Sequence, residues 1–295
     1  MTKPSLILVF FLLMSAAVSA VEPREALNEL AERLEEASYQ VIRYVEETGA
    51  MSVVRVERVI KAGTHKHVSV VTPLREYCWL RSSMGEFVII SNVAFEPLVP
   101  IMDSEDSFLE AIKRGEYEVS LFLVFPSGYR AVIADRGMNY DVVFTDRFRI
   151  SKLVKTHELY SVTVNYREYQ SLTEEAANTI STALSGMRLI RPTTKLLSSF
   201  VKEHFEWMAM DFSYDGKASL YILYLESSSY GRLTLYALFG GSYETLDQSV
   251  GQIATANQLN YSIVEISSSS VISVVGRQPS NELEQILDKL LGRAR

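Results

Sequence analysis

Hydrophobic and polar positions alternate with a period of two along most of the first half of this chain. In the segment 51–61, Val54, Val56 and Ile60 alternate with charged side chains. Successive side chains of a strand point to opposite faces, so this alternation predicts strands with one buried and one solvated face. Further strands are predicted at 39–45, 67–71, 87–90, 117–125, 129–135, 139–145, 149–155 and 159–169. Their regular spacing of about 8–12 residues predicts antiparallel hairpins in one large curved sheet or an open barrel.

Two segments of the first half have helical spacing instead. Residues 24–38 carry alanine and leucine at three- and four-residue intervals, and Pro23 precedes them, which is typical of an amphipathic helix. A second helix is predicted from Asp103, which can cap its start, through Phe108 to Gly115, which ends it.

The alternation stops between Thr173 and Thr194, where small and polar residues dominate and 191–194 is typical of a loop. A short helix through Ala176, Ile180 and Leu184 is a further expectation there. We predict four regions: a signal peptide at 1–20, a curved β-sheet domain at 21–172, a linker at 173–197 and a C-terminal domain at 198–295.

The C-terminal domain mixes strands and helices. Strands are predicted at 207–213, 218–226, 232–239, 259–267 and 271–275, and helices at 246–257 and from Pro279 onward. Asp215 and Gly216 form a typical hairpin turn between the first two strands. The order β-β-β-α-β-β-α predicts an α+β domain, so the whole chain is mainly β with a smaller α+β part.

Residues 1–20 have the pattern of a secretory signal. Lys3 gives a positive start, 6–13 is an apolar run, and small residues end at Ala20. No later stretch reaches the roughly 20 apolar residues that a membrane span needs, so we expect a soluble, exported protein. Cleavage after Ala20 removes one lysine and no acidic residue, which leaves 28 basic against 36 acidic residues, a net charge of 28 − 36 = −8. This charge disfavours nucleic acid or an anionic membrane surface as partner and suits a peptide or an apolar ligand.

Candidate chemistry is sparse. No H-E-x-x-H, C-x-x-C, G-x-S-x-G or G-x-G-x-x-G pattern occurs, and His65 and His67 alone do not make a metal site. The four serines 267–270 are typical of a hairpin loop. We therefore expect no catalytic residue, metal or cofactor. The single cysteine, Cys78, excludes an intramolecular disulfide, and we expect a buried, inert thiol; an intermolecular disulfide is the alternative.

Tyrosines concentrate in the C-terminal domain. At a period of two, Tyr214, Tyr221, Tyr224 and Tyr236 cannot all face the core. Tyrosine suits interfaces, because it joins an apolar ring to a polar hydroxyl. These four side chains are our candidate partner-binding residues; the alternative is that they only pack the sheet.

The chain resembles the RseB/MucB family of periplasmic regulators of sigma-E (AlgU-type) factors. The similar segments, in order, are Ala26–Gln40, Tyr44–Glu46, Gly49–Val56, Pro73–Glu76, Tyr117–Val119, Gly128–Ile133, Asn139–Arg147, Ile150–Leu153, Tyr214–Ser219 and Val271–Pro279. Together they span nearly the whole mature chain. Departures include Thr72 in place of a glycine, and a tryptophan and a turn glycine missing near 139–153.

The resemblance implies a fold and a role. The first domain would be a large open antiparallel β-barrel like that of lipoprotein carriers, and the second a smaller α+β domain. In the periplasm, the protein would bind the periplasmic segment of an RseA/MucA-like membrane anti-sigma factor and shield it from site-1 proteolysis. An apolar ligand (lipid, lipopolysaccharide or lipoprotein) would release it upon envelope stress. A homodimer is compatible with this role, whereas nucleic acid is not expected as partner.

Two other functions stay open at this point. A periplasmic lipid or lipoprotein carrier on the same open barrel would explain the first domain and leave the second without a task. A secreted hydrolase with an unusual site is the third reading.

Overall fold

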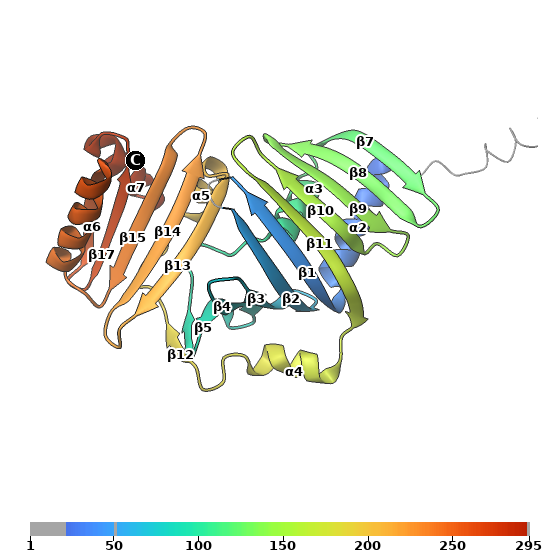
Figure 1. Cartoon of the computed structure of the whole chain (residues 1–295), viewed down its shortest axis with the longest axis horizontal. Helices are drawn as coiled ribbons and strands as arrows, with labels where there is room; N and C mark the ends of the chain where they lie inside the picture. Colours follow the sequence, from blue (N-terminus) through green and yellow to red (C-terminus); the bar gives the residue numbers. More distant parts are fainter. Residues whose placement is uncertain (1–21, 50–51, 294–295) are drawn as a thin grey trace, which may run out of the picture.

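The computed structural model describes residues 22–49 and 52–293, and the predicted signal peptide lies outside them. Two separate sheets dominate the structure (Figure 1). This arrangement confirms the predicted class, mainly β with a large antiparallel sheet and a smaller α+β part. Among the described residues, no helix is both long enough and apolar enough to cross a membrane.

The first sheet has twelve strands in the order β12-β6-β5-β4-β3-β2-β1-β11-β10-β9-β8-β7. They are β1 (Ser38–Thr48), β2 (Val53–Ala62), β3 (His65–Val71), β4 (Glu76–Ser82), β5 (Gly85–Ile90), β6 (Val93–Phe95), β7 (Glu118–Phe125), β8 (Gly128–Asp135), β9 (Met138–Thr145), β10 (Ile150–Thr156), β11 (Ser161–Ser171) and β12 (Arg188–Ile190). All neighbours are antiparallel except β12 and β6. The two end strands do not pair with each other, so the sheet is open.

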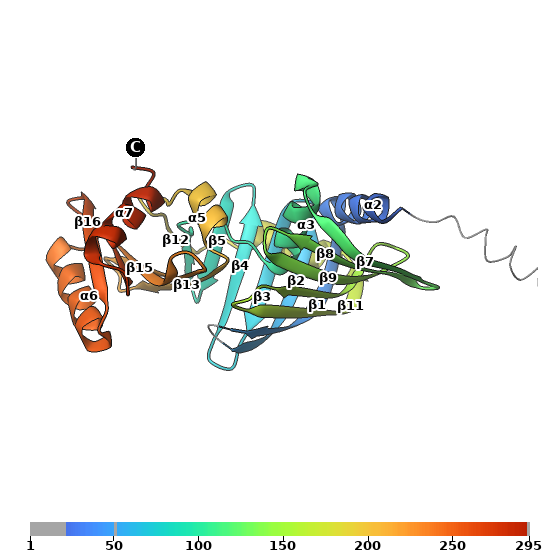
Figure 2. The ribbon, with the colours of Figure 1, turned by 90° about the horizontal axis from the view of Figure 1, so that it is seen from above.

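Two helices cover the inner face of this sheet, the face to which Tyr39, Val41 and Val45 of β1 point. They are α2 (Pro23–Glu36) and α3 (Ser104–Arg114), and the sheet curves around them (Figure 2). As predicted, Asp103 caps α3 and Gly115 ends it in the left-handed conformation. The buried leucines of α2 and Phe108 of α3 join the inner face in one large core.

A third helix, α4 (Glu174–Thr182), covers part of the outer face. Ala176 and Ile180 pack there against Ile60, Leu80 and Phe87 of β2, β4 and β5. This is the short helix expected in the linker, although it ends before Leu184. The chain then forms β12, which the sequence pattern did not predict because it has only three residues.

The second sheet has the order β13-β14-β15-β17-β16. Its elements are α5 (Ser198–His204), β13 (Trp207–Tyr214), β14 (Ser219–Ser227), β15 (Gly231–Phe239), α6 (Tyr243–Asn257), β16 (Asn260–Ser267), β17 (Ser270–Gly276) and α7 (Ser280–Leu290). Helices α5 and α7 pack on one face, hereafter the α7 face, through Val201, Leu283 and Leu287. Helix α6 packs on β16 and β17 from the opposite side, the α6 face.

Cys78 lies on β4, a strand missing from the prediction. Burial was expected, but the side chain is only half-buried. It points to the outer face, where its Sγ lies 3.7 Å from Ser69 Oγ, whereas the neighbouring Trp79 is buried on the inner face. The expectation was wrong because the flanking Tyr77 and Trp79 point to the inner face, and the outer face covers Cys78 only in part.

Two hairpin glycines should differ sharply in their tolerance of a methyl group. Both adopt a positive φ, but a Cβ at Gly128 would overlap the backbone of Phe144 and Thr145, whereas a Cβ at Gly63 would meet open space. We expect Gly63→Ala to cost about 1 kcal/mol and Gly128→Ala more than about 3 kcal/mol in urea unfolding. Equal losses of unfolding free energy would contradict this account of the β7–β8 turn.

Candidate functional site

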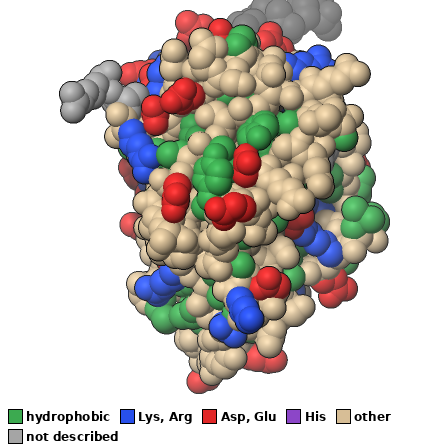
Figure 3. Space-filling view, turned by 90° about the vertical axis from the view of Figure 1, so that its left-hand side faces the viewer, with side chains coloured by type: hydrophobic (Ala, Val, Ile, Leu, Met, Phe, Trp, Pro, Cys, Tyr) green, Lys and Arg blue, Asp and Glu red, His purple; other side chains and the backbone are tan. Residues whose placement is uncertain are grey.

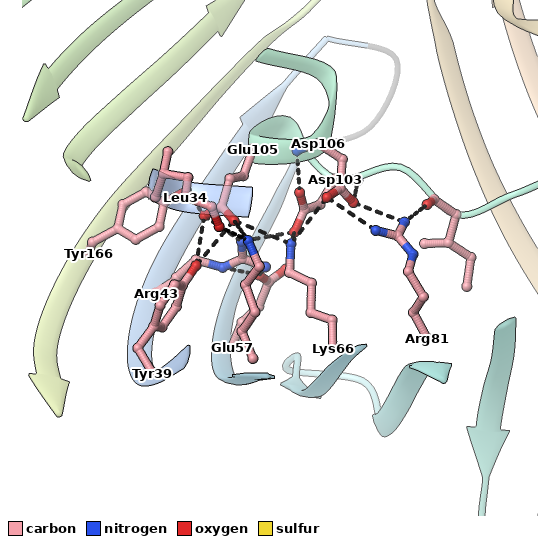
Figure 4. A network of polar contacts seen from close by, with 12 residues as sticks. Leu34, Tyr39, Arg43, Glu57, Lys66, Arg81, Asp103, Glu105, Asp106 and Tyr166 are labelled. Carbon is pink, nitrogen blue, oxygen red and sulfur yellow. Dashed lines mark hydrogen bonds and ion pairs between the residues drawn. The ribbon is translucent and has the colours of Figure 1, made fainter. Parts of the chain in front are cut away.

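A buried network of charged side chains lies between the inner face of the first sheet and the start of α3 (Figure 4). The inner face supplies the cations, and the start of α3 supplies three carboxylates. The members are Arg43 of β1, Glu57 and Lys61 of β2, Lys66 of β3, Arg81 of β4, and Asp103, Glu105 and Asp106. Cross-strand pairing explains the alignment, because Arg43 faces Glu57 and Lys66 faces Lys61 and Arg81.

Asp103 is the centre of this network. Its Oδ2 lies 2.8 Å from Arg43 Nη1 and 2.7 Å from Lys66 Nζ, while its Oδ1 accepts the backbone N–H of Asp106 at 2.9 Å. One carboxylate thus caps α3 and pairs with two cations of the sheet. Arg43 also pairs with Glu57 at 2.6 Å. Negative and positive side chains therefore alternate along the series Glu57, Arg43, Asp103 and Lys66.

Glu105 is fully buried, yet its carboxylate is well satisfied. It accepts hydrogen bonds from the hydroxyls of Tyr39 and Tyr166, both at 3.1 Å at their shortest. Lys66 and Lys61 lie 3.7 and 3.9 Å away. An isolated buried carboxylate would be very costly, so these four partners keep Glu105 ionised inside the core.

Burial and the neighbouring charges set the pKa values in the network. Burial opposes the ionisation of Asp103, but Lys66 and Arg43 outweigh it and hold the pKa of that carboxyl well below its usual range. The pKa of Glu105 is also lowered, because Lys66 and Lys61 outweigh its burial. Burial and the charge of Asp103 raise the pKa of Asp106.

The network reaches the second sheet. Glu57 pairs with Arg55 at 2.7 Å, Arg55 with Glu47 at 2.9 Å, and Glu47 accepts a hydrogen bond from the indole N–H of Trp207 on β13. Tyr160 adds a second contact, because its hydroxyl donates to the carbonyl of Glu206 at 2.6 Å. The arrangement therefore fixes α3 on the sheet and joins the two sheets. Within the described residues, no group of three or more His, Cys, Asp or Glu side chains is placed to hold a metal ion.

The four tyrosines proposed as partner-binding residues lie on two opposite faces of the second sheet. Tyr221 and Tyr214 are on the α7 face. Tyr221 is 0% exposed and packs against Phe95, Phe212 and Phe239, so a partner cannot reach it without unfolding. The structure therefore corrects its assignment from partner contact to core. Tyr214 is half-buried, with the Arg188 guanidinium 4.7 Å from the centre of its ring.

Tyr224 and Tyr236 are on the α6 face. Tyr224 pairs with Thr234 and Ile222 with Tyr236, so the two tyrosines are diagonal neighbours. Tyr224 is 36% exposed, and Ile222 and Tyr236 are half-buried. Helix α6 covers β16 and β17, and none of the described helices crosses this side of β13–β15 (Figure 1). We call the surface formed by Ile222, Tyr224, Thr234 and Tyr236 the tyrosine face.

The end of the molecule that carries α6 and α7 has a different surface. A small hydrophobic area there lies among acidic side chains, with basic ones farther out (Figure 3). Scattered apolar groups of this kind are normal on a protein surface.

Sequence reasoning missed a cleft on the outer face of the first sheet. It has a volume of about 260 Å³ and lies between α4 and β2–β4, with Leu80, Met84 and Ile180 in its lining and His65 at its side. Only the packing of α4 creates it, so no local signal in the sequence could have indicated it.

Comparison with solved structures finds similar proteins. The structure is similar to the solved structure of MucB, with a TM-score of 0.43, 11% identity, and 93% of this chain and 98% of that chain covered. It is also similar to MucB in complex with MucA(peri), with a TM-score of 0.37, 11% identity and coverages of 89% and 96%. For LprF from Mycobacterium bovis, the TM-score is 0.28, the identity 6% and the coverages 51% and 93%.

The sequence comparisons gave no relative. No family model matches this chain, and no curated protein matches it.

The buried network predicts a large, pH-dependent effect of removing one cation. Lys66→Met leaves Asp103 and Glu105 short of a partner, which should cost about 3–5 kcal/mol of unfolding free energy near pH 7. Losing Lys66 raises the pKa of both carboxyls, so the folded variant takes up protons as the pH falls. The difference in unfolding free energy between the variant and the wild type should therefore become smaller toward about pH 5. Urea unfolding at both pH values measures this.

The matched control is Lys113→Met, whose partner is Glu35 on the surface. An exposed pair is worth less than about 1 kcal/mol and should show little of this pH dependence. Similar losses of unfolding free energy for the two variants would contradict the role given to Lys66 in the buried network. A difference between Lys66→Met and the wild type that grows on acidification would contradict it too.

Proposed function

We propose that this protein is a periplasmic, non-catalytic negative regulator of an extracytoplasmic stress sigma factor. It binds the periplasmic segment of an RseA/MucA-like anti-sigma factor on the tyrosine face of the second sheet. The observation that carries this proposal is the tyrosine face itself: a patch of aromatic and aliphatic side chains on β14 and β15 that stays partly exposed beside α6. Tyr224 is its exposed member, whereas Tyr236 packs in part against the core under α6. The resemblance of the sequence to the RseB/MucB family supports the choice of partner.

The chemistry of the tyrosine face suits an extended peptide. Tyr224 and Tyr236 offer flat rings with polar hydroxyls, and Ile222 lies opposite Tyr236 and two residues from Tyr224 on β14. Interface energy usually comes from a few such anchors. The edge strand β13 borders the same face and carries Asp211, which pairs with Arg75 of the first sheet, so a bound segment would lie beside both sheets.

We propose further that binding shields the anti-sigma segment from site-1 proteolysis, and that an apolar lipid ligand ends this protection. A segment held against a sheet cannot enter a protease groove in the extended form that cleavage requires. The cleft between α4 and β2–β4 is our candidate for an acyl chain, because Leu80, Met84 and Ile180 line it.

The lipid-carrier alternative would place its cargo on the inner face of the first sheet. That face is covered by α2 and α3, and the ion network fastens α3 to it. A carrier would have to break buried ion pairs to load its cargo, which is costly. We therefore favour the regulator.

Tyr224 and Tyr221 provide the direct test of the tyrosine face, since they lie three residues apart on opposite sides of β14. Tyr221→Ala removes a buried ring and should destabilise the second sheet by about 3–5 kcal/mol. Tyr224→Ala should leave the melting temperature nearly unchanged and weaken binding by about 1–2 kcal/mol, roughly five- to thirty-fold. Titration calorimetry with the periplasmic segment of the anti-sigma factor measures the affinity.

Tyr44→Ala is the matched control. Tyr44 is 46% exposed on the outer face of the first sheet and should bind like the wild type. Normal binding by folded Tyr224→Ala, or an equal loss in Tyr44→Ala, would move the binding site away from the second sheet.

A further inference from the structure

Helix α4 is held on the outer face of the first sheet by few side chains. It has 9 residues and buries only Ala176 and Ile180. A helix this short is marginal on its own in water, so its position depends on those contacts. Its start is tied to β1, because the Gln40 side-chain amide donates to Thr173 Oγ1 at 3.4 Å. The rest of α4 lies beside the sheet between two connecting loops (Figure 1) and can lift at a low cost in free energy.

A buried imidazole lies beneath α4. His67 is on the outer face of β3, where it pairs with Ile60 of β2 and Leu80 of β4. These two side chains pack against Ala176 and Ile180 of α4. His67 is only 7% exposed, and its Nδ1 is buried without a hydrogen-bond partner among the described residues. The helix therefore encloses a titratable side chain in apolar surroundings.

The surroundings of His67 oppose its protonation. Burial lowers the pKa of His67, and the positive charge of Arg58, on the same face of β2, lowers it further. The carboxylates on α4 and on the outer face of β4 are exposed to water and do not enclose the imidazole. The other titratable or charged groups on α4, on the outer face of β3 and β4, and in the segment after β12 are His65, Glu76, Cys78, Glu174, Glu175 and Arg191.

We propose that α4 is an acid-operated lid, which protonation of His67 releases from the outer face of the first sheet. A neutral imidazole tolerates burial between two aliphatic side chains, whereas an imidazolium needs water or a carboxylate. Once α4 lifts, His67 is hydrated and takes up a proton near the ordinary pKa of histidine, 6.5. The closed state is therefore fully favoured above that pH and loses stability as the pH falls below it.

Opening of the lid changes the surface of the first sheet. It uncovers the aliphatic and aromatic side chains that α4 shields, Ile60, Leu80 and Phe87 among them. It also removes one wall of the cleft between α4 and β2–β4. The inference goes beyond the proposed function, because the lid responds to protons whatever the cleft or the tyrosine face binds.

The single cysteine offers a built-in probe of the lid. Cys78 is half-buried on the outer face of β4 and packs against the same side chains as α4. The test measures its rate of reaction with a dithiodipyridine, which attacks thiols in acid as well as at neutral pH. Wild type and His67→Leu are compared at each pH, so that the ionisation of the thiol itself cancels in the ratio of their rates.

The ratio of the wild-type rate to the His67→Leu rate should rise about five-fold or more between about pH 7.5 and about pH 5. The leucine cannot take up a proton and suits its neighbours Ile60 and Leu80, so α4 should stay closed in that variant. His65→Leu is the matched control. It removes a half-buried imidazole beside the cleft and should keep the acid response of the wild type.

Hydrogen exchange followed by mass spectrometry on the wild type decides the matter even if His67→Leu does not fold. Exchange in 174–182, corrected for the intrinsic effect of pH, should accelerate on acidification, while exchange in the β8–β9 hairpin stays unchanged. A ratio of thiol rates that does not change with pH would overturn the proposal, as would an acid response that is lost in His65→Leu. Acceleration of exchange throughout the chain would also overturn it, because it would show general acid unfolding.

Discussion

The structure depends on the pairing of three carboxylates at the start of α3 with cations on the inner face of the first sheet. Asp103, Glu105 and Asp106 enter the core together, and each would be prohibitive there alone. Arg43 and Lys66 reach them only because β1–β4 align their side chains across the sheet. The same ion pairs thus fix the position of α3 and the register of four strands.

This constraint affects the rest of the molecule. Helix α3 and its neighbour α2 cover the inner face, which would otherwise be the obvious place for a ligand. The chain of alternating charges continues through Arg55 and Glu47 to Trp207, so the second sheet is held against the first. What remains open lies elsewhere: the tyrosine face beside α6 and the cleft between α4 and β2–β4.

Much of the fold follows from local patterns. The period-two alternation predicted most strands to within a few residues, and Asp103 and Gly115 marked the ends of α3. Strand β4 was missed, because Tyr77, Cys78, Trp79 and Leu80 form an uninterrupted apolar run that shows no alternation. Strand β12 was missed because its parallel pairing with β6 is tertiary and has no local signal.

The candidate site was less predictable than the fold. The tyrosines were visible in the sequence, but only the register shows that Tyr221 is core while Tyr224 and Tyr236 share a face. The ion network was invisible, because Arg43 and Asp103 are 60 residues apart and look like ordinary surface charges in a sequence. Alternation held a hint only for Arg43, which shares its face of β1 with Val41 and Val45. In β2 the alternation was misleading: Val54 and Val56 are 61 and 38% exposed, whereas Glu57 and Lys61 are buried on the inner face.

The central claim is that the anti-sigma segment lies on the tyrosine face, and site-specific photocross-linking tests it most directly. A photoreactive phenylalanine analogue would replace Tyr224 in one variant and Tyr44, which is more exposed, in another. On irradiation with the periplasmic segment of the anti-sigma factor, the account predicts a covalent adduct from position 224 and none from position 44. Adducts from position 44 alone would contradict it and place the partner on the outer face of the first sheet.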